Sequence, residues 1–177
     1  SDLDENIQLI CHIVPEIKKF IFIGDARQIN QTNNLDIRNK LKKTHPNVEY
    51  QFITPQDMTT NQLLDSLYFV DPKTTGVLFS SWFYKTTFAG NTSLVSNAHK
   101  LIGTTAAPIF TLNMADITEE NGGMIGGYTH NQKHFNQQLI HTIAEILAGK
   151  QARDIPFYIP TDGAPIINYK ILLRKGF

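Results

Sequence analysis

Polar and aromatic side chains follow the ends of several short apolar runs, the pattern expected of a small-molecule binding site. The runs have the composition of strands buried on both faces, and ligands bind beyond the carboxyl ends of such strands in an open parallel sheet. Loops and helix N-termini converge there with unpaired N–H groups. The predicted ligand-binding residues are Asp25, Gln28, Asn30, Ser81, Trp82, Tyr84, Asn113, Asp116 and Tyr128.

The chemistry of this set is recognition rather than reaction. Amides, hydroxyls and carboxylates can orient a small polar or amphiphilic molecule while aromatic rings cover its apolar face. Single members also have structural interpretations: Asp25 and Asn30 suit turns or helix caps, and Trp82 suits a half-buried anchor. It is their joint position at strand ends that favours a site.

Metal or cofactor binding has little support in the sequence. His130 and His134 are four residues apart at the start of a predicted helix, a spacing that can bring two imidazoles to one metal ion. No third ligand is evident, because His141 and Glu145 are farther along the helix, and a solvated helix face is the better interpretation. The glycines of NGGMIGGY match neither the dinucleotide nor the P-loop pattern and are expected to permit tight turns. We expect neither a metal nor a cofactor.

Nucleophilic catalysis is the alternative to binding. A small α/β hydrolase or transferase would use Ser81 or Asp116. No G-x-S-x-G elbow surrounds Ser80 or Ser81, and Cys11 is predicted on the core face of a helix. A histidine within hydrogen-bonding reach of Ser81, itself held by an acid, would decide for the enzyme. The residues favour a non-catalytic protein.

Strand-like and helical segments alternate along the chain, which predicts an α/β fold with a parallel sheet flanked by helices. The helices are recognised by apolar residues three and four apart, and Thr59 with Gln62 suits a capping box. Strands are expected at 20–23, 48–53, 76–79, 108–112, 124–128, 155–160 and 164–170, and helices at 3–14, 35–45, 60–69, 93–102, 132–147 and 169–176.

Composition limits the possible partners of this 177-residue chain. It is 41% hydrophobic and 18% charged, which places it among folded domains. Sixteen basic and sixteen acidic residues give a net charge of +0, so no overall field attracts nucleic acid or an anionic membrane. No apolar run reaches the roughly 18 residues that cross a bilayer, and SDLDENIQLI lacks the features of a signal peptide. Any anchor or export signal is expected outside this segment.

Four stretches follow one another in a recognisable order: ENIQLICHIVPEIKKFIFIGD, SLYFVDPKTTGVLFSSW, AAPIFTLNMADITEENGGMIGGY and AEILAGKQARDIPFYIPTDGAPIINYKILLRKGF. This order resembles the C-terminal part of type I periplasmic binding proteins, most of all the ABC-type substrate-binding proteins related to tryptophan and tyrosine binders. The ending is the most specific piece. Its matching residues are, in order, Ile146, Leu147, Gly149, Lys150, Ala152, Asp154, Ile155, Pro156, Asn168 and Gly176.

The resemblance implies a Rossmann-like lobe that binds an amino acid or a similar polar or aromatic solute. It covers nearly the whole chain but only about half of a family protein, so the N-terminal lobe is missing. Residues 1–128 would form the C-terminal lobe. Residues 129–177 would supply a long helix, hinge-crossing strands and a terminal stub helix, belonging to the same unit or to the missing lobe.

The surface, rich in Asn, Gln and Thr, also resembles the extracytoplasmic sensor regions of bacterial hybrid two-component histidine kinases. This implies a periplasmic or extracytoplasmic location, anchoring to the membrane in the full-length protein, and a sensor function. The solute-binding component of an ABC transporter is the alternative. Without the other lobe, the long helix would expose an apolar stripe, and we expect its own sheet or a second copy to cover it, a homodimer being favoured. The stripe consists of Phe135, Leu139, Ile143 and Ile146.

Overall fold

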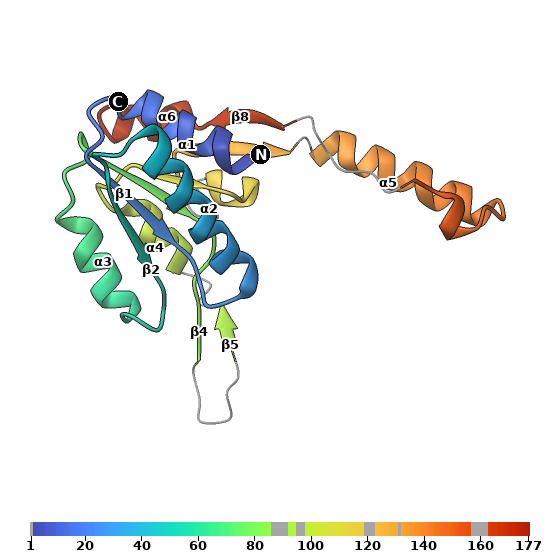
Figure 1. Cartoon of the computed structure of the whole chain (residues 1–177), viewed down its shortest axis with the longest axis horizontal. Helices are drawn as coiled ribbons and strands as arrows, with labels where there is room; N and C mark the ends of the chain where they lie inside the picture. The colour runs from blue at the N-terminus through green and yellow to red at the C-terminus, as the bar shows by residue number, and fades with distance from the viewer. Residues whose placement is uncertain (1, 86–91, 95–97, 119–122, 131, 157–162) are drawn as a thin grey trace.

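The chain folds around a mostly parallel six-stranded sheet in the order β2-β1-β3-β6-β7-β8, with helices on both faces (Figure 1). This computed structural model describes residues 2–85, 92–94, 98–118, 123–130, 132–156 and 163–177. Within this sheet, β8 runs antiparallel to its neighbour β7, and the other described pairs are parallel. The predicted α/β class is therefore confirmed. The strands are β1 (Lys19–Ile23), β2 (Glu49–Ile53), β3 (Thr75–Phe79), β6 (Ile109–Thr111), β7 (Gly126–His130) and β8 (Gly163–Ile167), and β4 (Phe83–Lys85) pairs with β5 (Thr92–Leu94) in a separate antiparallel ribbon.

Two apolar clusters hold the layers together, one on each face of the sheet. Successive strand residues point to opposite faces, so Phe20 and Phe22 of β1 enter one cluster and Ile21 and Ile23 enter the other. The first cluster is covered by α1 (Asp2–Ile13), α2 (Gln28–Thr44) and α6 (Tyr169–Arg174), and the second by α3 (Thr60–Tyr68) and α4 (Ala98–Thr104). Because all of β1 beyond Lys19 is buried, its uninterrupted apolar run is explained.

Most of the predicted strands and helices are present, and the Thr59–Gln62 capping box lies at the start of α3. The helix predicted at 35–45 begins seven residues earlier, at Gln28. Other expectations were wrong. The helix predicted from Ser93 begins at Ala98, because Ser93 lies on β5 and pairs with Tyr84 of β4. Ile155 and Pro156 are not in a strand, and residues 157–160 of the same predicted strand lie outside the described residues.

Another error concerns two of the glycines of NGGMIGGY. Gly126 and Gly127 lie inside β7 rather than in a tight turn. A Cβ at Gly127 would overlap the carbonyl oxygen of Thr111, and one at Gly126 would overlap that of Ile166. These glycines allow neighbouring backbones to approach closely, whereas Gly123, with φ 64°, has the positive φ of a turn glycine.

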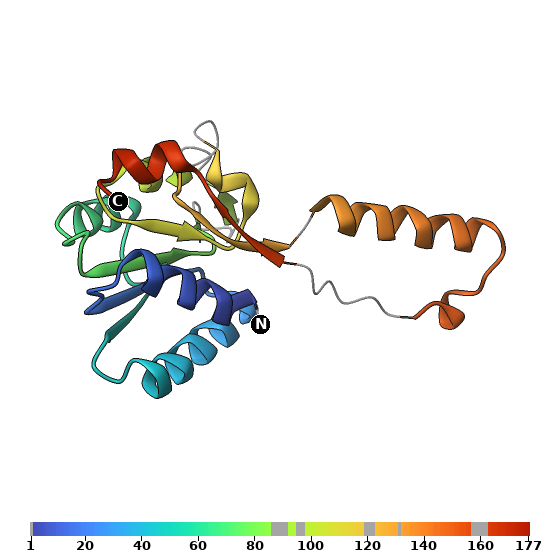
Figure 2. The same ribbon diagram turned by 90° about the horizontal axis from the view of Figure 1, so that it is seen from above.

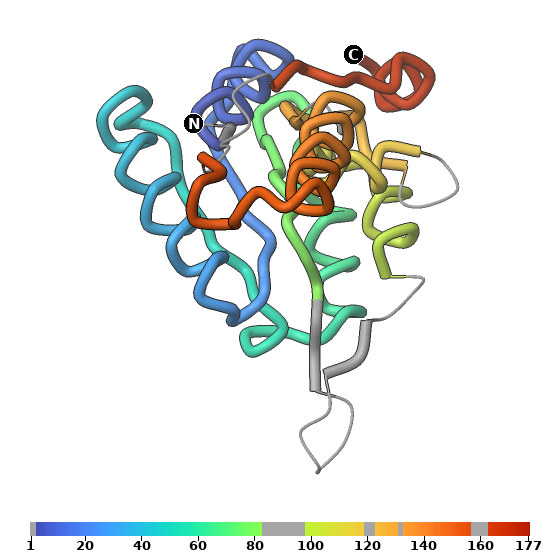
Figure 3. Tube along the Cα trace, turned by 90° about the vertical axis from the view of Figure 1, so that its right-hand side faces the viewer, coloured from blue at the N-terminus to red at the C-terminus, as the bar shows by residue number. Residues whose placement is uncertain are grey.

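The long helix α5 (Gln132–Leu147) projects from the body as an arm (Figure 2). The chain returns through a short 3-10 helix, η2 (Ala152–Asp154), to β8, which pairs with β7. Seen along the axis of the arm, α5 stands in front of the body (Figure 3). It does not fold back on the sheet, so that alternative was wrong. No helix among the described residues is long and apolar enough to cross a membrane.

Candidate functional site

The parallel strands β1, β3, β6 and β7 end at the same edge of the sheet, and most of the predicted site residues lie just beyond those ends. We call this the carboxyl edge. Asp25 follows β1, Ser81 follows β3 and Asn113 follows β6. The arm α5 leaves the body from this edge as well, because it begins directly after β7.

Asp25, Asn30 and Ser81 form one buried hydrogen-bonded cluster behind the edge. The Ser81 hydroxyl donates to Asp25 Oδ2 at 2.7 Å, and the Asn30 amide donates to Asp25 Oδ1 at 2.8 Å and to Ser81 Oγ at 2.9 Å. Ser80 donates to Asn30 Oδ1 at 2.7 Å. All three residues are buried. Their polar atoms are already used inside the protein, so they support the site rather than contact a ligand.

Arg27 is hydrogen-bonded to this cluster, and its side chain faces solvent. Its Nε lies 2.9 Å from both carboxylate oxygens of Asp25, and Nη2 lies 2.9 Å from Oδ2. The Arg27 side chain is nevertheless 55% exposed, against 4% for Asp25. Burial opposes ionisation of Asp25, but hydrogen bonds from Arg27, Ser81 and Asn30 outweigh it and hold the pKa of Asp25 below its ordinary value. A buried carboxylate therefore fixes an exposed guanidinium at the carboxyl edge.

Other exposed side chains follow the strand ends at the carboxyl edge and belong to the candidate site. Gln28 lies in the first turn of α2, and Asn113 caps the 3-10 helix η1 (Met114–Ile117), where its Oδ1 accepts from the Ala115 N–H at 3.1 Å. Ile29 and Met114 expose apolar surface at 59% and 42%. The sequence-based set omitted Arg27, Ile29 and Met114. The Asp-x-Arg spacing could have indicated Arg27, but nothing in the sequence indicated that the two apolar side chains face outward.

Asp116 belongs to a second buried cluster. Its Oδ1 lies 3.0 Å from His99 Nδ1, and Thr111 donates to Oδ2 at 3.2 Å. His99 also packs edge-on against Phe79. Asp116 thus anchors η1 to α4 and β6. His99 Nε2 is buried and, in the described part of the chain, without a hydrogen-bond partner.

Trp82 is placed differently from the prediction. The side chain is 0% exposed, lies in the cluster under α3 and α4, and donates from Nε1 to Thr60 Oγ1 at 3.0 Å. The chain turns inward after Ser81, so the ring packs in the core and cannot line a concave surface. Tyr84 lies on β4, and its side chain is outside the described residues.

Tyr128 lies on β7 near the root of the arm and is half-buried. Asn6 of α1 holds its backbone with two hydrogen bonds of 2.8 Å, one to the carbonyl oxygen and one from the N–H. Its ring lies against Gly163 of β8, where any larger residue would overlap it. Tyr128 therefore stands where the arm and the body join.

The described residues do not contain the parts of a hydrolytic or metal site. Ser81 is hydrogen-bonded to Asp25 and Asn30 and to no histidine, so the arrangement that would have decided for an enzyme is not formed. Within the described ranges no three His, Cys, Asp or Glu residues gather as metal ligands would. Burial raises the pKa of the Cys11 thiol, which keeps it in its unreactive form.

No protein-family model matches the sequence, and no curated protein matches it. Solved structures do. A substrate-binding protein with adhesive properties from Clostridium difficile, CD0873, superposes with a TM-score of 0.65 over 98% of this chain and 55% of its own, at 14% identity. An ABC domain from Streptococcus pneumonia in complex with L-Trp gives a TM-score of 0.66 over 99% and 57%, at 14% identity.

A 5-methylthioribose transporter solute-binding protein from Thermotoga lettingae gives a TM-score of 0.58 over 98% of this chain and 59% of its own, at 11% identity. This chain has the fold of one lobe of a solute-binding protein. It spans little more than half the length of these structures. The predicted Rossmann-like lobe is confirmed, while the identities are too low to carry a ligand from one protein to another.

Proposed function

We propose that this chain is one lobe of an extracytoplasmic binding protein that holds a small polar or amphiphilic solute at the carboxyl edge. The observation that carries the proposal is Arg27, which the buried carboxylate of Asp25 holds in an exposed position. Exposed Gln28 follows it in α2, and exposed Asn113 lies at the same end of the sheet, after β6. Fixing a charged donor in advance lowers the entropic cost of binding. Ile29 and Met114 offer apolar surface to the remainder of the solute.

The arm supports a second lobe facing this edge. Phe135, Leu139, Ile143 and Ile146 are between 39% and 47% exposed, and a helix with such a stripe needs a covering partner. Because α5 leaves from the carboxyl edge, a partner packed on it would also lie over Arg27 and enclose the solute. The greater length of the similar structures agrees with a missing lobe.

The solute-binding component of an ABC transporter is the form of this function that the comparisons favour. Two of the similar proteins are described as a substrate-binding protein and a transporter solute-binding protein, and another was solved with L-Trp. The role as sensor region of a membrane-anchored histidine kinase stays a prediction from the resemblance, and the sequence of the full gene product tests it. In either role this lobe binds without catalysing.

Calorimetry with L-amino acids, aromatic acids and pentoses tests the proposal. Arg27→Gln is expected to weaken binding of the solute that the wild type takes by about 10-fold or more, because a charge-assisted hydrogen bond is lost. Arg153→Gln is the matched control, since Arg153 is exposed on η2, away from the edge. Equal affinities for wild type and Arg27→Gln would remove Arg27 from the site.

A further inference from the structure

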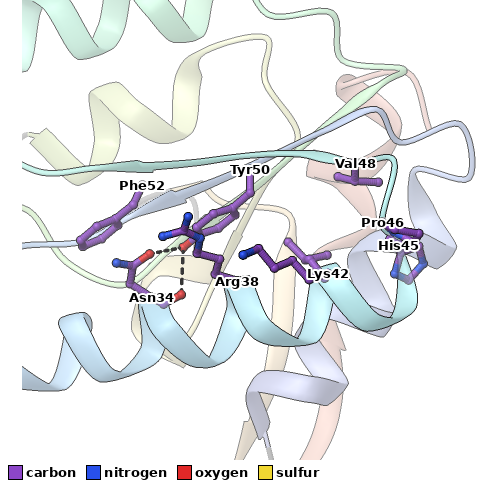
Figure 4. Close-up of a pocket in the computed structure, with 9 residues that line it drawn as sticks. Asn34, Arg38, Lys42, His45, Pro46, Val48, Tyr50 and Phe52 are labelled. Carbon is purple, nitrogen blue, oxygen red and sulfur yellow. Dashed lines mark hydrogen bonds between the residues drawn. The ribbon is translucent and has the colours of Figure 1, made fainter.

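A groove lies between α2, from Asn34 onward, and the edge strand β2 (Figure 4). Its volume is about 500 Å³, within the range of roughly 300 to 1,000 Å³ that small-molecule sites occupy. The residues of this groove, which we call the α2/β2 groove, are Asn34, Arg38, Leu41, Lys42, His45, Pro46, Val48, Tyr50 and Phe52.

The groove lies where α2 packs beside β2 and leaves the side chains of this edge strand incompletely covered. Ile37 and Leu41 are buried in the core beneath the helix. The neighbouring helical positions over β2 are the polar residues Asn34, Arg38 and Lys42, which follow one another at four-residue spacing. Long polar side chains do not fill the space as aliphatic ones would, so Val48, Tyr50 and Phe52 of the strand side remain partly accessible.

Two fixed aromatic rings form the floor. Phe52 stacks on Phe22 with centroids 5.2 Å apart and an interplanar angle of 16°. The ring centroid of Tyr50 lies 6.4 Å from that of Phe20, and the Tyr50 hydroxyl donates to Asn34 Oδ1 at 2.7 Å. Burial raises the pKa of Tyr50, so the phenol stays neutral. The floor is therefore apolar, uncharged and held in position.

The rim carries positive charge that the protein leaves unneutralised. Arg38 and Lys42 extend from α2 toward the strand (Figure 4). No carboxylate lines the groove, and neither cation has an ion pair in the described ranges. The nearby lysines differ, since Lys40 pairs with Asp4 at 3.4 Å and Lys19 pairs with Glu49 at 3.2 Å.

We propose that the α2/β2 groove is a second binding site, which takes a small aromatic carboxylate with its ring on Tyr50 and Phe52 and its acid group between Arg38 and Lys42. A planar guanidinium binds a carboxylate through two parallel hydrogen bonds, and an ammonium beside it adds attraction without a fixed direction. A ring above stacked aromatics gains contact area at little entropic cost. The site is independent of the function proposed for the carboxyl edge.

A small molecule fits this groove better than an added peptide strand. A peptide would pair with the outer backbone edge of β2, where main-chain hydrogen bonds give the affinity. The groove instead lies between α2 and the face of the strand, and side chains line it. A strand added at the edge would leave the rings of Tyr50 and Phe52 and the cations on α2 without a ligand.

The test uses naphthalene-2-carboxylate and its neutral amide, titrated into the ¹⁵N-labelled 177-residue chain. The acid is expected to shift the amide resonances of 34–52 and to bind about five-fold or more tightly than the amide. Arg38→Gln and Lys42→Gln should each remove most of this preference. Lys43→Gln makes the same charge change at the next exposed position of α2. It should leave the ratio of acid to amide affinity within about two-fold of the wild-type ratio.

Arg27→Gln should not alter these shifts, which separates the α2/β2 groove from the carboxyl edge. Circular dichroism melting checks that each variant is folded, and all four positions are exposed. The proposal is overturned if the acid and amide bind equally, if Lys42→Gln and Lys43→Gln behave alike, or if the shifts fall on α5 or near Arg27.

Discussion

At the scale of single residues, Asp25 decides what the loop after β1 presents to solvent. It accepts hydrogen bonds from the Arg27 backbone and side chain, from Asn30 and from Ser81, so none of its oxygen atoms is left for a solute. The place of the site stays a prediction, but the polar atoms of Asp25, Asn30 and Ser81 bond to one another inside the protein. These three residues, predicted as ligand contacts, hold Arg27, the contact that we propose in their stead.

Asp25→Asn is expected to lower the free energy of unfolding by about 1 to 3 kcal/mol at pH 7, because charge-assisted hydrogen bonds in a buried cluster are lost. The folded pKa of Asp25 is lowered from 3.8. Its contribution is thus complete above pH 3.8 and is lost as the pH falls through the folded value. Urea unfolding of both proteins across this range checks the sign, with exposed Asp36→Asn as control. A difference in the free energy of unfolding between wild type and Asp25→Asn that grows toward low pH would contradict the account.

At the scale of elements, the C-terminal helix α6 explains why the ending of the sequence is distinctive. Asn168 caps it by accepting from the Ile171 N–H at 3.3 Å and donates to the Ile117 carbonyl at 3.1 Å, which ties α6 to η1. Lys175 donates to the carbonyl of Ala107 at 2.9 Å, which ties the helix end to the start of β6. Gly176 adopts φ 86°, the left-handed conformation that ends helices.

Asn168→Ala should therefore destabilise both the start of α6 and its connection to η1. We expect about 1 to 2 kcal/mol of destabilisation, at the upper end for a lost N-cap, because the bond to η1 is lost as well. Hydrogen exchange should accelerate in α6 and in η1 together. Asn39→Ala, an exposed change within α2, is the control. Faster exchange in α6 alone would show that Asn168 does not couple the two elements.

Helices and strands could be predicted where a local signal, such as a fully apolar run or a capping pair, decides the structure. The run from Phe20 to Ile23 is apolar on both sides, and the Thr59–Gln62 pair marks the start of a helix, so β1 and α3 were predicted correctly. The positions of Trp82 and of the glycines of β7 could not be predicted. Trp82 turns inward to bond with Thr60, and Gly126 and Gly127 lie against the backbones of neighbouring strands. Both depend on residues distant in sequence.

At the scale of the whole molecule, packing within the body does not account for the arm α5, which projects away from it. It carries an apolar stripe away from the core and leaves from the carboxyl edge, where Arg27 stands. Under the proposed function, a single partner would cover the stripe and close the site in one step. Without a partner the stripe is exposed to water, which opposes exposed apolar surface.

We predict that the isolated chain self-associates through α5. Burying the four stripe residues gains several kcal/mol, at about 1.5 to 3 kcal/mol for each fully buried side chain. Sedimentation at low micromolar concentration should show dimers, and Leu139→Gln with Ile143→Gln should return the chain to monomer. His141→Gln is the control, because the His141 side chain is polar and 71% exposed. A wild-type monomer at these concentrations would refute self-association and leave the binding proposal intact.

The central claim is that the carboxyl edge binds the solute. Its most direct test is mapping of ¹H–¹⁵N shift changes on the 177-residue chain as L-tryptophan, or whichever solute calorimetry selects, is added. The account predicts that the largest changes fall together on 27–29 and 113–114, and that Arg27→Gln reduces them strongly at equal solute concentration. Changes that avoid both loops, or that persist unchanged in Arg27→Gln, would contradict it.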